Sequence, residues 1–226
     1  MKAPLLVMAF LAFLTMPALA QTAVQPKDDP NLVFHNALVD LPARNGAELT
    51  VTTPAWVSGG DIPFENSDFR GNRFPGMSWS AGPAGTRSYA IILQDSGFVG
   101  SVRHRPLTLH WTLYDVPADV TNLPVGMPVT GFPPGSSYGP SAQGKSMPYM
   151  GPGPPPGPRH VYHLQVFALD KTIPIDADMS FEALTGAMKD HVLASGEIIG
   201  LGAVDPDNWP RKPRPATLSV PASAAR

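Results

Sequence analysis

The sequence predicts a single β-rich domain with many tight turns and long ordered loops, and three observations support this. Several short apolar runs have the length and β-branched composition of strands. Proline and glycine are abundant, with 28 and 21 residues among 226, roughly double their usual combined share. The chain has no cysteine. A hydrophobic core must therefore hold the fold without disulfides, and about 200 residues are enough to build one.

Residues 1–20 are predicted to be a signal peptide. Lys2 supplies a positive start, Leu5 to Leu14 is an uninterrupted apolar run, and Ala18-Leu19-Ala20 is a small-x-small cleavage site. The run is shorter than the roughly 20 apolar residues that span a bilayer. A buried N-terminal helix is the alternative. We expect cleavage after Ala20, a periplasmic or secreted product, and no transmembrane segment.

The two ends of the mature chain have the composition of disordered segments. Residues 21–31 are polar, charged and proline-containing without periodicity, which predicts a flexible arm. Residues 205–226 contain five prolines and four basic residues, which predicts a Pro-rich basic tail that is disordered. One domain is expected between them, over residues 32–204. The net charge of −2 gives no reason to expect nucleic-acid binding, which requires a strongly basic face.

The first part of the domain is predicted to contain two early strands and a long loop. Leu32 to Leu41 and Glu48 to Val57 combine apolar and β-branched residues, with turn formers around Asn45-Gly46 between them. Ser58 to Met77 holds several glycines and prolines and is long for a loop. Loops of that length are usually either functional or poorly ordered.

Three runs have clear strand patterns. Ser88 to Gln94 is continuous and apolar, as in a strand buried on both faces, whereas Leu107 to Val116 alternates. His160 to Leu169 is the third strand. Pro117 to Arg159 is rich in proline, glycine and serine, and its Gly151 to Gly157 part cannot be helix or central strand, because proline lacks an amide donor.

One helix is predicted, late in the chain. Ser180 is a suitable N-cap, and Gly196 or Gly200 would end or bend the helix. The apolar stripe that defines it consists of Leu184, Ala187, Met188 and Val192.

Polar side chains gather at one end of the predicted strands. The two-residue period places Asp95 on the same side as Leu93, at the end of its strand. His160 and Tyr162 share a face of the third strand, and His163 points the other way. The glycine-proline loop precedes His160, and its glycines would let backbone amides approach a ligand closely.

Several segments, in one consistent order, carry a family pattern. They are the Pro-x-Gly-Thr-x-Ser turn and strand within Trp79–Asp95, His110-Trp111 followed by Pro117, the Tyr-x-Gly-Pro-x-Pro-Pro run within Tyr149–Tyr162, Phe167–Asp170, and His191–Gly200. This pattern resembles the phosphatidylethanolamine-binding protein family, in its bacterial Raf-kinase-inhibitor-like branch. The resemblance covers roughly residues 32–203.

The resemblance implies a mainly β fold, with a large central antiparallel sheet packed on a smaller sheet and short late helices. It also implies an anion pocket in which glycine amides surround phosphate-like oxygens while imidazole and phenol groups donate further hydrogen bonds. Asp95 would orient His110 or accept from an amine-bearing head group. The matching pocket positions are Asp95, His110, Gly151, Gly153, Pro154, His160 and Tyr162.

The chain departs from the family pattern at three positions. Gly97 stands where the family usually has a second aspartate, Val161 replaces the arginine between histidine and tyrosine, and Gly202 replaces a late tyrosine. These differences predict a less acidic pocket with a more open gate.

Three functions are weighed. The first is an exported pocket protein that binds a small anionic ligand, with a phospholipid head group among the candidates. The second is an inhibitor of a protease or kinase acting through the same pocket face, although export makes a cytosolic kinase an implausible partner. The third is an Asp/His hydrolase, since Gln94-Asp95-Ser96-Gly97 weakly matches a serine-protease loop. Structural roles for Asp95 as a loop cap and for the histidines in the core are the alternatives to any site.

No cofactor or metal is expected. The short histidine pair His160 and His163 diverges on a strand, and no His-x-His, cysteine or His-Glu-x-x-His pattern is present. No catalytic residue is assigned, and the identity of any protein partner is left open.

Overall fold

The computed structural model describes residues 36–98, 107–126, 133–141, 148–176 and 178–210. The predicted signal peptide, the predicted arm at 21–31 and most of the predicted tail lie outside the described residues. The described elements in chain order are α1 (Ala37–Asp40), β1 (Ala47–Glu48), β2 (Val51–Thr52), β3 (Gly60–Asp61), η2 (Phe64–Asn66), β4 (Met77–Trp79), β5 (Ser88–Phe98), β6 (Thr108–Pro117), β7 (Asn122–Leu123), β8 (Ser137–Tyr138), β9 (His160–Leu169), α2 (Phe181–Met188), β10 (Val192–Gly202) and η3 (Pro206–Asn208).

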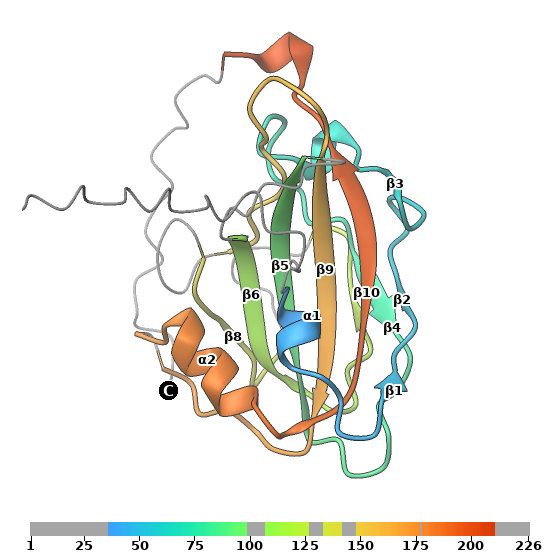
Figure 1. The fold of residues 1–226 in the computed structure, drawn as a ribbon, viewed down its shortest axis with the longest axis vertical. Coiled ribbons are helices and arrows are strands. Elements are labelled where there is room, and N and C mark those ends of the chain that lie inside the picture. Colours follow the sequence, from blue (N-terminus) through green and yellow to red (C-terminus); the bar gives the residue numbers. More distant parts are fainter. Residues whose placement is uncertain (1–35, 99–106, 127–132, 142–147, 177, 211–226) are drawn as a thin grey trace, which may run out of the picture.

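A large seven-stranded sheet and a small three-stranded sheet form the fold (Figure 1). The large sheet has the order β1-β10-β9-β5-β6-β8, with β3 also beside β10, and the small sheet has the order β2-β4-β7. The long strands are antiparallel, whereas the two-residue strands β1 and β3 pair with β10 in parallel. The predicted arrangement of a large sheet on a smaller one is confirmed, with the refinement that the large sheet is mixed.

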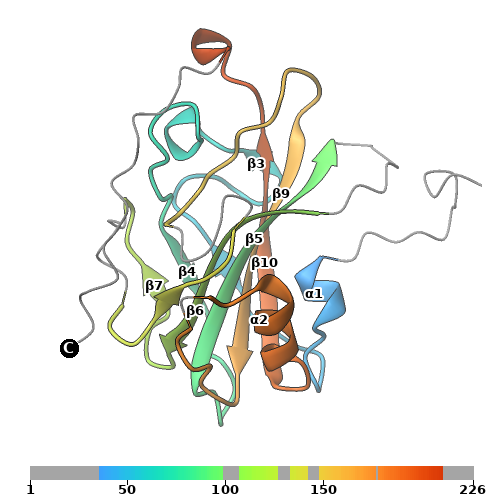
Figure 2. The ribbon, with the colours of Figure 1, turned by 90° about the vertical axis from the view of Figure 1, so that its left-hand side faces the viewer.

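The large sheet is the central layer, with the small sheet on one side and α1 and α2 on the other (Figure 2). We call these two sides of the large sheet the inner face and the helix face. Residues of the inner face pack against the small sheet in one core, which includes Ile91, Leu93, Trp111, Leu164, Met77 and Trp79. Residues of the helix face form the second core, which includes Ile92, Tyr114, Phe167, Leu184, Met188 and Ala37.

The three runs predicted as strands are strands. The third spans His160–Leu169, as predicted, and the second spans Thr108–Pro117. The first continues beyond Gln94 to Phe98, and its middle residues are buried from both faces because both cores use it.

The predicted strand over Leu32 to Leu41 is wrong for its described part. Residues 37–40 form one helical turn, because the Asn36 side chain caps it by accepting from Val39 N at 3.1 Å. Two buried glutamines then hold the turn on the helix face. Gln94 Oε1 accepts from Ala37 N at 2.8 Å, and Gln165 Oε1 accepts from Leu38 N at 2.7 Å.

The late helix begins where the sequence predicts, but it ends earlier. Ser180 caps it by accepting from Ala183 N at 3.1 Å, and the helix stops at Met188 before Asp190 takes a left-handed φ of 64°. The chain then becomes β10, so Val192 and Gly196 belong to a strand. A Cβ at Gly196 would lie 2.0 Å from the Leu49 carbonyl oxygen, so glycine here permits a close backbone approach.

The described fold continues past the expected domain boundary at 204. Asp205 is fully buried, and its side chain accepts from Asp207 N at 3.1 Å to cap η3. Arg70 pairs with it through a bidentate contact in which Nη2 lies 3.0 Å from Oδ1. This ion pair holds the pKa of the Asp205 carboxyl far below its usual range.

Candidate functional site

Four of the predicted site residues meet at the end of the long strands where the Gly-Pro loop lies. Asp95 is near the end of β5 and faces Tyr162 across the β5–β9 pairing, on the inner face. His160 begins β9, and His110 lies near the start of β6. We call Asp95, His110, His160 and Tyr162 the Asp95 cluster.

His110 reaches the Asp95 cluster because β6 contains a bulge. Leu93 pairs with Trp111 and the next residue, Gln94, pairs with Leu109, so His110 is an extra residue in β6. Leu109 packs in the helix-face core and Trp111 in the inner-face core. The inserted residue therefore faces inward with Trp111, and its ring contacts the Tyr162 ring edge-on at 5.2 Å between centroids.

The carboxylate is fixed from two directions. Gly97 N donates to Asp95 Oδ1 at 2.6 Å, and Gly97 has a left-handed φ of 90° that favours glycine. His160 Nδ1 lies 2.8 Å from Asp95 Oδ2, whereas His110 Nε2 lies 3.9 Å from the same oxygen. Asp95 thus holds His160 by a hydrogen bond. The expectation that it orients His110 is replaced by this geometry.

Tyr162 completes the cluster, because its ring contacts both imidazoles. Its ring stacks on the His160 ring at 26° and 6.5 Å, and it meets the His110 ring at 77°. Both Tyr162 and His110 are buried. Aromatic contacts of this kind restrict the orientation of each ring, so the nitrogen atoms have defined positions.

Burial lowers the pKa of His110 below that of an ordinary histidine. Asp95, the Met150 and Gly151 carbonyls and Asp68 act in the opposite direction and do not overcome desolvation. His110 is therefore neutral at pH 7, with one donor and one acceptor nitrogen. Asp68 belongs to the long loop over 58–77, and sequence reasoning named that loop but not this residue.

The glycine-proline loop from Gly151 to Gly157 lies against the cluster, but its first glycine has a structural role. Gly151 N donates to Asn72 Oδ1 at 2.7 Å, and a Cβ at Gly151 would lie 2.1 Å from the Asn66 carbonyl oxygen. The Gly151 amide is thus already bonded within the protein. Gly153 is half-buried and Pro154 is buried, and a ligand role for both stays a prediction.

The space beside Gly202 is filled. A Cβ at Gly202 would lie 2.4 Å from Tyr162 Cε2 and 3.0 Å from Pro152 Cβ. The glycine that replaces the family's tyrosine therefore lets Tyr162 and Pro152 close over this position, which differs from the predicted open gate.

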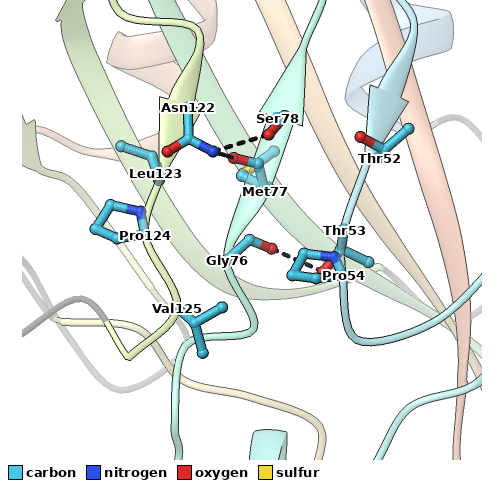
Figure 3. Close-up of a pocket in the computed structure, with 10 residues that line it drawn as sticks. All are labelled: Thr52, Thr53, Pro54, Gly76, Met77, Ser78, Asn122, Leu123, Pro124 and Val125. Atoms are coloured by element: carbon cyan, nitrogen blue, oxygen red, sulfur yellow. Dashed lines mark hydrogen bonds between the residues drawn. The ribbon is translucent and has the colours of Figure 1, made fainter.

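A surface hollow of about 440 Å³ lies elsewhere, over the small sheet (Figure 3). None of the seven predicted site residues lines it, and none of its lining residues has a titratable side chain. We place the candidate site at the Asp95 cluster because ionisable groups converge there. The hollow is lined by Thr52, Thr53, Pro54, Gly76, Met77, Ser78, Asn122, Leu123, Pro124 and Val125.

Metal binding and membrane insertion can each be considered for the described residues. Among them, no group of three or more His, Cys, Asp or Glu side chains could hold a metal ion. No helix in the described part of the chain has the length and apolar character needed to cross a membrane.

Comparisons with known proteins agree with this architecture. The family model described as phosphatidylethanolamine-binding protein matches residues 52–202. A UPF0098 protein of Methanothermobacter thermautotrophicus is 32% identical over 154 residues, covering 68% of this chain and 97% of that protein. The chain therefore belongs to the phosphatidylethanolamine-binding protein family.

Solved structures show the same fold. A putative phosphatidylethanolamine-binding protein homolog from Chlamydia trachomatis superposes with a TM-score of 0.60 at 28% identity, covering 70% of this chain and 99% of that one. YbcL of Escherichia coli, whose structure is described as a new member of the mammalian family, gives a TM-score of 0.60 at 29% identity, with 70% and 100% covered.

Proposed function

We propose that this chain is an exported binding protein that holds a small anionic, phosphate-bearing ligand at the Asp95 cluster. The observation that supports the proposal is the carboxylate of Asp95 placed between two imidazoles, 2.8 Å from His160 and 3.9 Å from His110. Membership of a family named for binding phosphatidylethanolamine is consistent with a ligand of this class.

The side chains of the Asp95 cluster favour an anion that is held by hydrogen-bond donors and not only by positive charge. Neutral His110 and the Tyr162 hydroxyl are hydrogen-bond donors of the kind that phosphate oxygens accept. The hydrogen bond between His160 Nδ1 and Asp95 fixes the orientation of that imidazole, and its other ring nitrogen is assigned a role in contacting the ligand. Because Gly151 N is engaged by Asn72, amides further along the loop would supply any backbone donors.

Binding is preferred over Asp/His hydrolysis because of how Asp95 is used. Both of its oxygens accept hydrogen bonds, one from Gly97 N and one from His160 Nδ1. Such a carboxylate positions an imidazole, and it is poorly placed to act as a nucleophile or to activate water.

Calorimetric titration at pH 7 tests the ligand class, with inorganic phosphate, phosphoethanolamine and phosphatidylethanolamine vesicles as separate probes. We expect His160→Ala to weaken binding by about 1.5–3 kcal/mol, the range for a hydrogen bond to a charged group. This corresponds to a rise in Kd of about 10- to 150-fold. His191→Ala is the matched control, because His191 pairs with Asp170 outside the cluster. Equal Kd values for His160→Ala and the unaltered protein would refute the assignment.

Export is tested separately, by intact-mass measurement of protein recovered from a secreting host. The expected product begins at Gln21, after cleavage at Ala20. A full-length product in the cytoplasm would contradict the predicted signal peptide without bearing on the ligand.

A further inference from the structure

A second polar cluster lies on the helix face of the large sheet, away from the Asp95 cluster. It consists of Ser96 on β5, His163 on β9 and Glu197 on β10, which we call the serine relay. These three strands are neighbours in the sheet, so the side chains lie in a row. Strand alternation predicts that His163 faces away from His160, but the sequence alone indicates no partner for it.

The distances form a continuous hydroxyl–imidazole–carboxylate chain. Ser96 Oγ lies 3.0 Å from His163 Nε2, and His163 Nδ1 lies 2.9 Å from Glu197 Oε2. A carboxylate at Nδ1 favours the tautomer with the proton on that nitrogen, which leaves Nε2 as an acceptor for the serine proton. This is the arrangement that activates a serine as a nucleophile.

A strand irregularity places Ser96 in the relay. Asp95 pairs with Tyr162 but Phe98 pairs with His160, so Ser96 and Gly97 both lie opposite Val161. Ser96 Oγ lies 3.4 Å from the Val161 carbonyl oxygen, a longer contact than the one to His163. Bulges of this kind often re-aim side chains at active sites.

The relay is partly screened from water yet is reachable. The side chains of His163 and Glu197 are 14% and 21% exposed, and Ser96 is half-buried. Partial burial strengthens the electrostatic coupling along the row, because the local dielectric constant is lower than in water.

Hydrogen-bonding side chains surround the serine relay and hold its residues in place. Asn36 Nδ2 lies 3.3 Å from His163 Nδ1 and 3.4 Å from Glu197 Oε2, so the residue that caps α1 contacts both the imidazole and the carboxylate. Beneath it, Gln165 Nε2 donates to Gln94 Oε1 at 2.9 Å, and both glutamines hold the first turn of α1. Positions fixed in this way suit a catalytic group better than positions on a free loop.

We propose that Ser96, His163 and Glu197 form a catalytic triad that hydrolyses carboxylic esters with good leaving groups. Ser96 Oγ adds to the ester carbonyl carbon while its proton passes to His163 Nε2. The carbon–oxygen bond to the alcohol breaks, and the alcohol leaves with that proton. Water then attacks the acyl-serine, gives a proton to His163, and releases the carboxylic acid as Ser96 Oγ regains the proton.

Activated esters are the expected substrates because the nearest amide is not available as an oxyanion donor. Gly97 N, the next amide after Ser96, donates to Asp95 Oδ1. Loss of an oxyanion donor costs a serine hydrolase about 100- to 1,000-fold in rate. An ester whose alcohol leaves easily needs less of this stabilisation than an amide does.

Covalent labelling of the full chain tests the proposal. A fluorophosphonate probe is expected to add once, at Ser96, as located by peptide mass mapping, and p-nitrophenyl acetate is expected to be hydrolysed. Ser96→Ala should abolish labelling at this position, and His163→Gln should slow labelling and hydrolysis by about 100-fold, the lower range for a general base. Ser195→Ala, which removes another half-buried hydroxyl from β10, is the matched control and should label normally.

Unfolding curves in urea establish that each variant is folded before its rate is compared. Absence of a Ser96 adduct on the folded protein would overturn the proposal. Equal labelling rates for folded His163→Gln and the unaltered chain would do the same, since a hydrogen-bonded but inert serine predicts that result. Slower labelling in Glu197→Gln would support the carboxylate's part in the relay.

Discussion

His110 gives a prediction about stability that follows from its burial. Its pKa is lowered in the folded protein, whereas in the unfolded chain it titrates near the ordinary value of about 6.5. Below that pH His110 binds a proton in the unfolded state but stays neutral in the folded state. The free energy of unfolding therefore falls as the pH falls. If the folded imidazole stays neutral throughout, the loss between pH 7.5 and 5.5 is about 1 kcal/mol.

His110→Gln removes this titration while keeping a polar group where Nε2 lies. We expect the variant's stability to fall less between pH 7.5 and 5.5 than that of the unaltered chain, even if the variant is less stable overall. Asp95 and Asp68, which act on His110, and His160, which is bonded to Asp95, are retained in both proteins. Urea titrations followed by tryptophan fluorescence give the two curves, with buried Trp111 as a nearby reporter.

Tyr162→Phe is the control, because it alters the same cluster without removing an imidazole. It should retain the pH slope of the unaltered chain. Parallel curves for His110→Gln and the unaltered chain would refute the reasoning, because they would mean that the folded state takes up the His110 proton as readily as the unfolded state does.

Further predictions concern packing and the end of the fold. Gly202→Ala should lower the free energy of unfolding by about 1–3 kcal/mol, the usual cost of overpacking, because its Cβ would lie 2.4 Å from Tyr162 Cε2. Gly186→Ala, within α2 and with no atom near the added Cβ, should instead stabilise by up to about 1 kcal/mol, and thermal unfolding distinguishes the two signs. Arg70→Ala should destabilise the protein at neutral pH and move acid unfolding to higher pH, since Asp205 loses the partner that lowers its pKa. Unchanged acid unfolding would show that this ion pair does not hold the C-terminal segment.

The long strands β5, β6 and β9 could be predicted from their apolar runs, but the face of each side chain could be predicted only where the alternation is uninterrupted. From His160 to Leu169 the two-residue period assigns each side chain to its face correctly, and the separation of His160 from His163 follows from it. The pairing of Asp95 with Tyr162 was not predicted, because alternation along one strand does not say which strand lies beside it.

Bulges are what the sequence pattern could not reveal. His110 faces Asp95, and Ser96 reaches His163, only because one strand carries an extra residue at each point. A bulge is defined by the partner strand as much as by its own residues, so alternation along a single run does not locate it. The glycine at position 97, which has a left-handed φ of 90° in the structure, is a sequence signal for the second bulge, whereas the family pattern marks it only as the replacement of an aspartate.

The error at the last strand has a different origin. Met188 and Val192 are four residues apart, which continues a helical stripe, although the left-handed Asp190 between them ends the helix. Gly196 and Gly200 suggested a helix end. In the structure their missing side chains admit Leu49 and Ile62, contacts with segments about 140 residues earlier that no local pattern contains.

The parallel pairing of β1 and β3 with β10 has a consequence for the order in which the protein is made. The first and third strands to be synthesised have no partner in the large sheet until the last strand appears, and β10 also covers the open edge of β9. The sheet therefore cannot close on the ribosome before residue 202 has emerged. Folds dominated by such distant pairings form slowly. A precursor that carries the predicted signal peptide would therefore remain incompletely folded until residue 202 has left the ribosome.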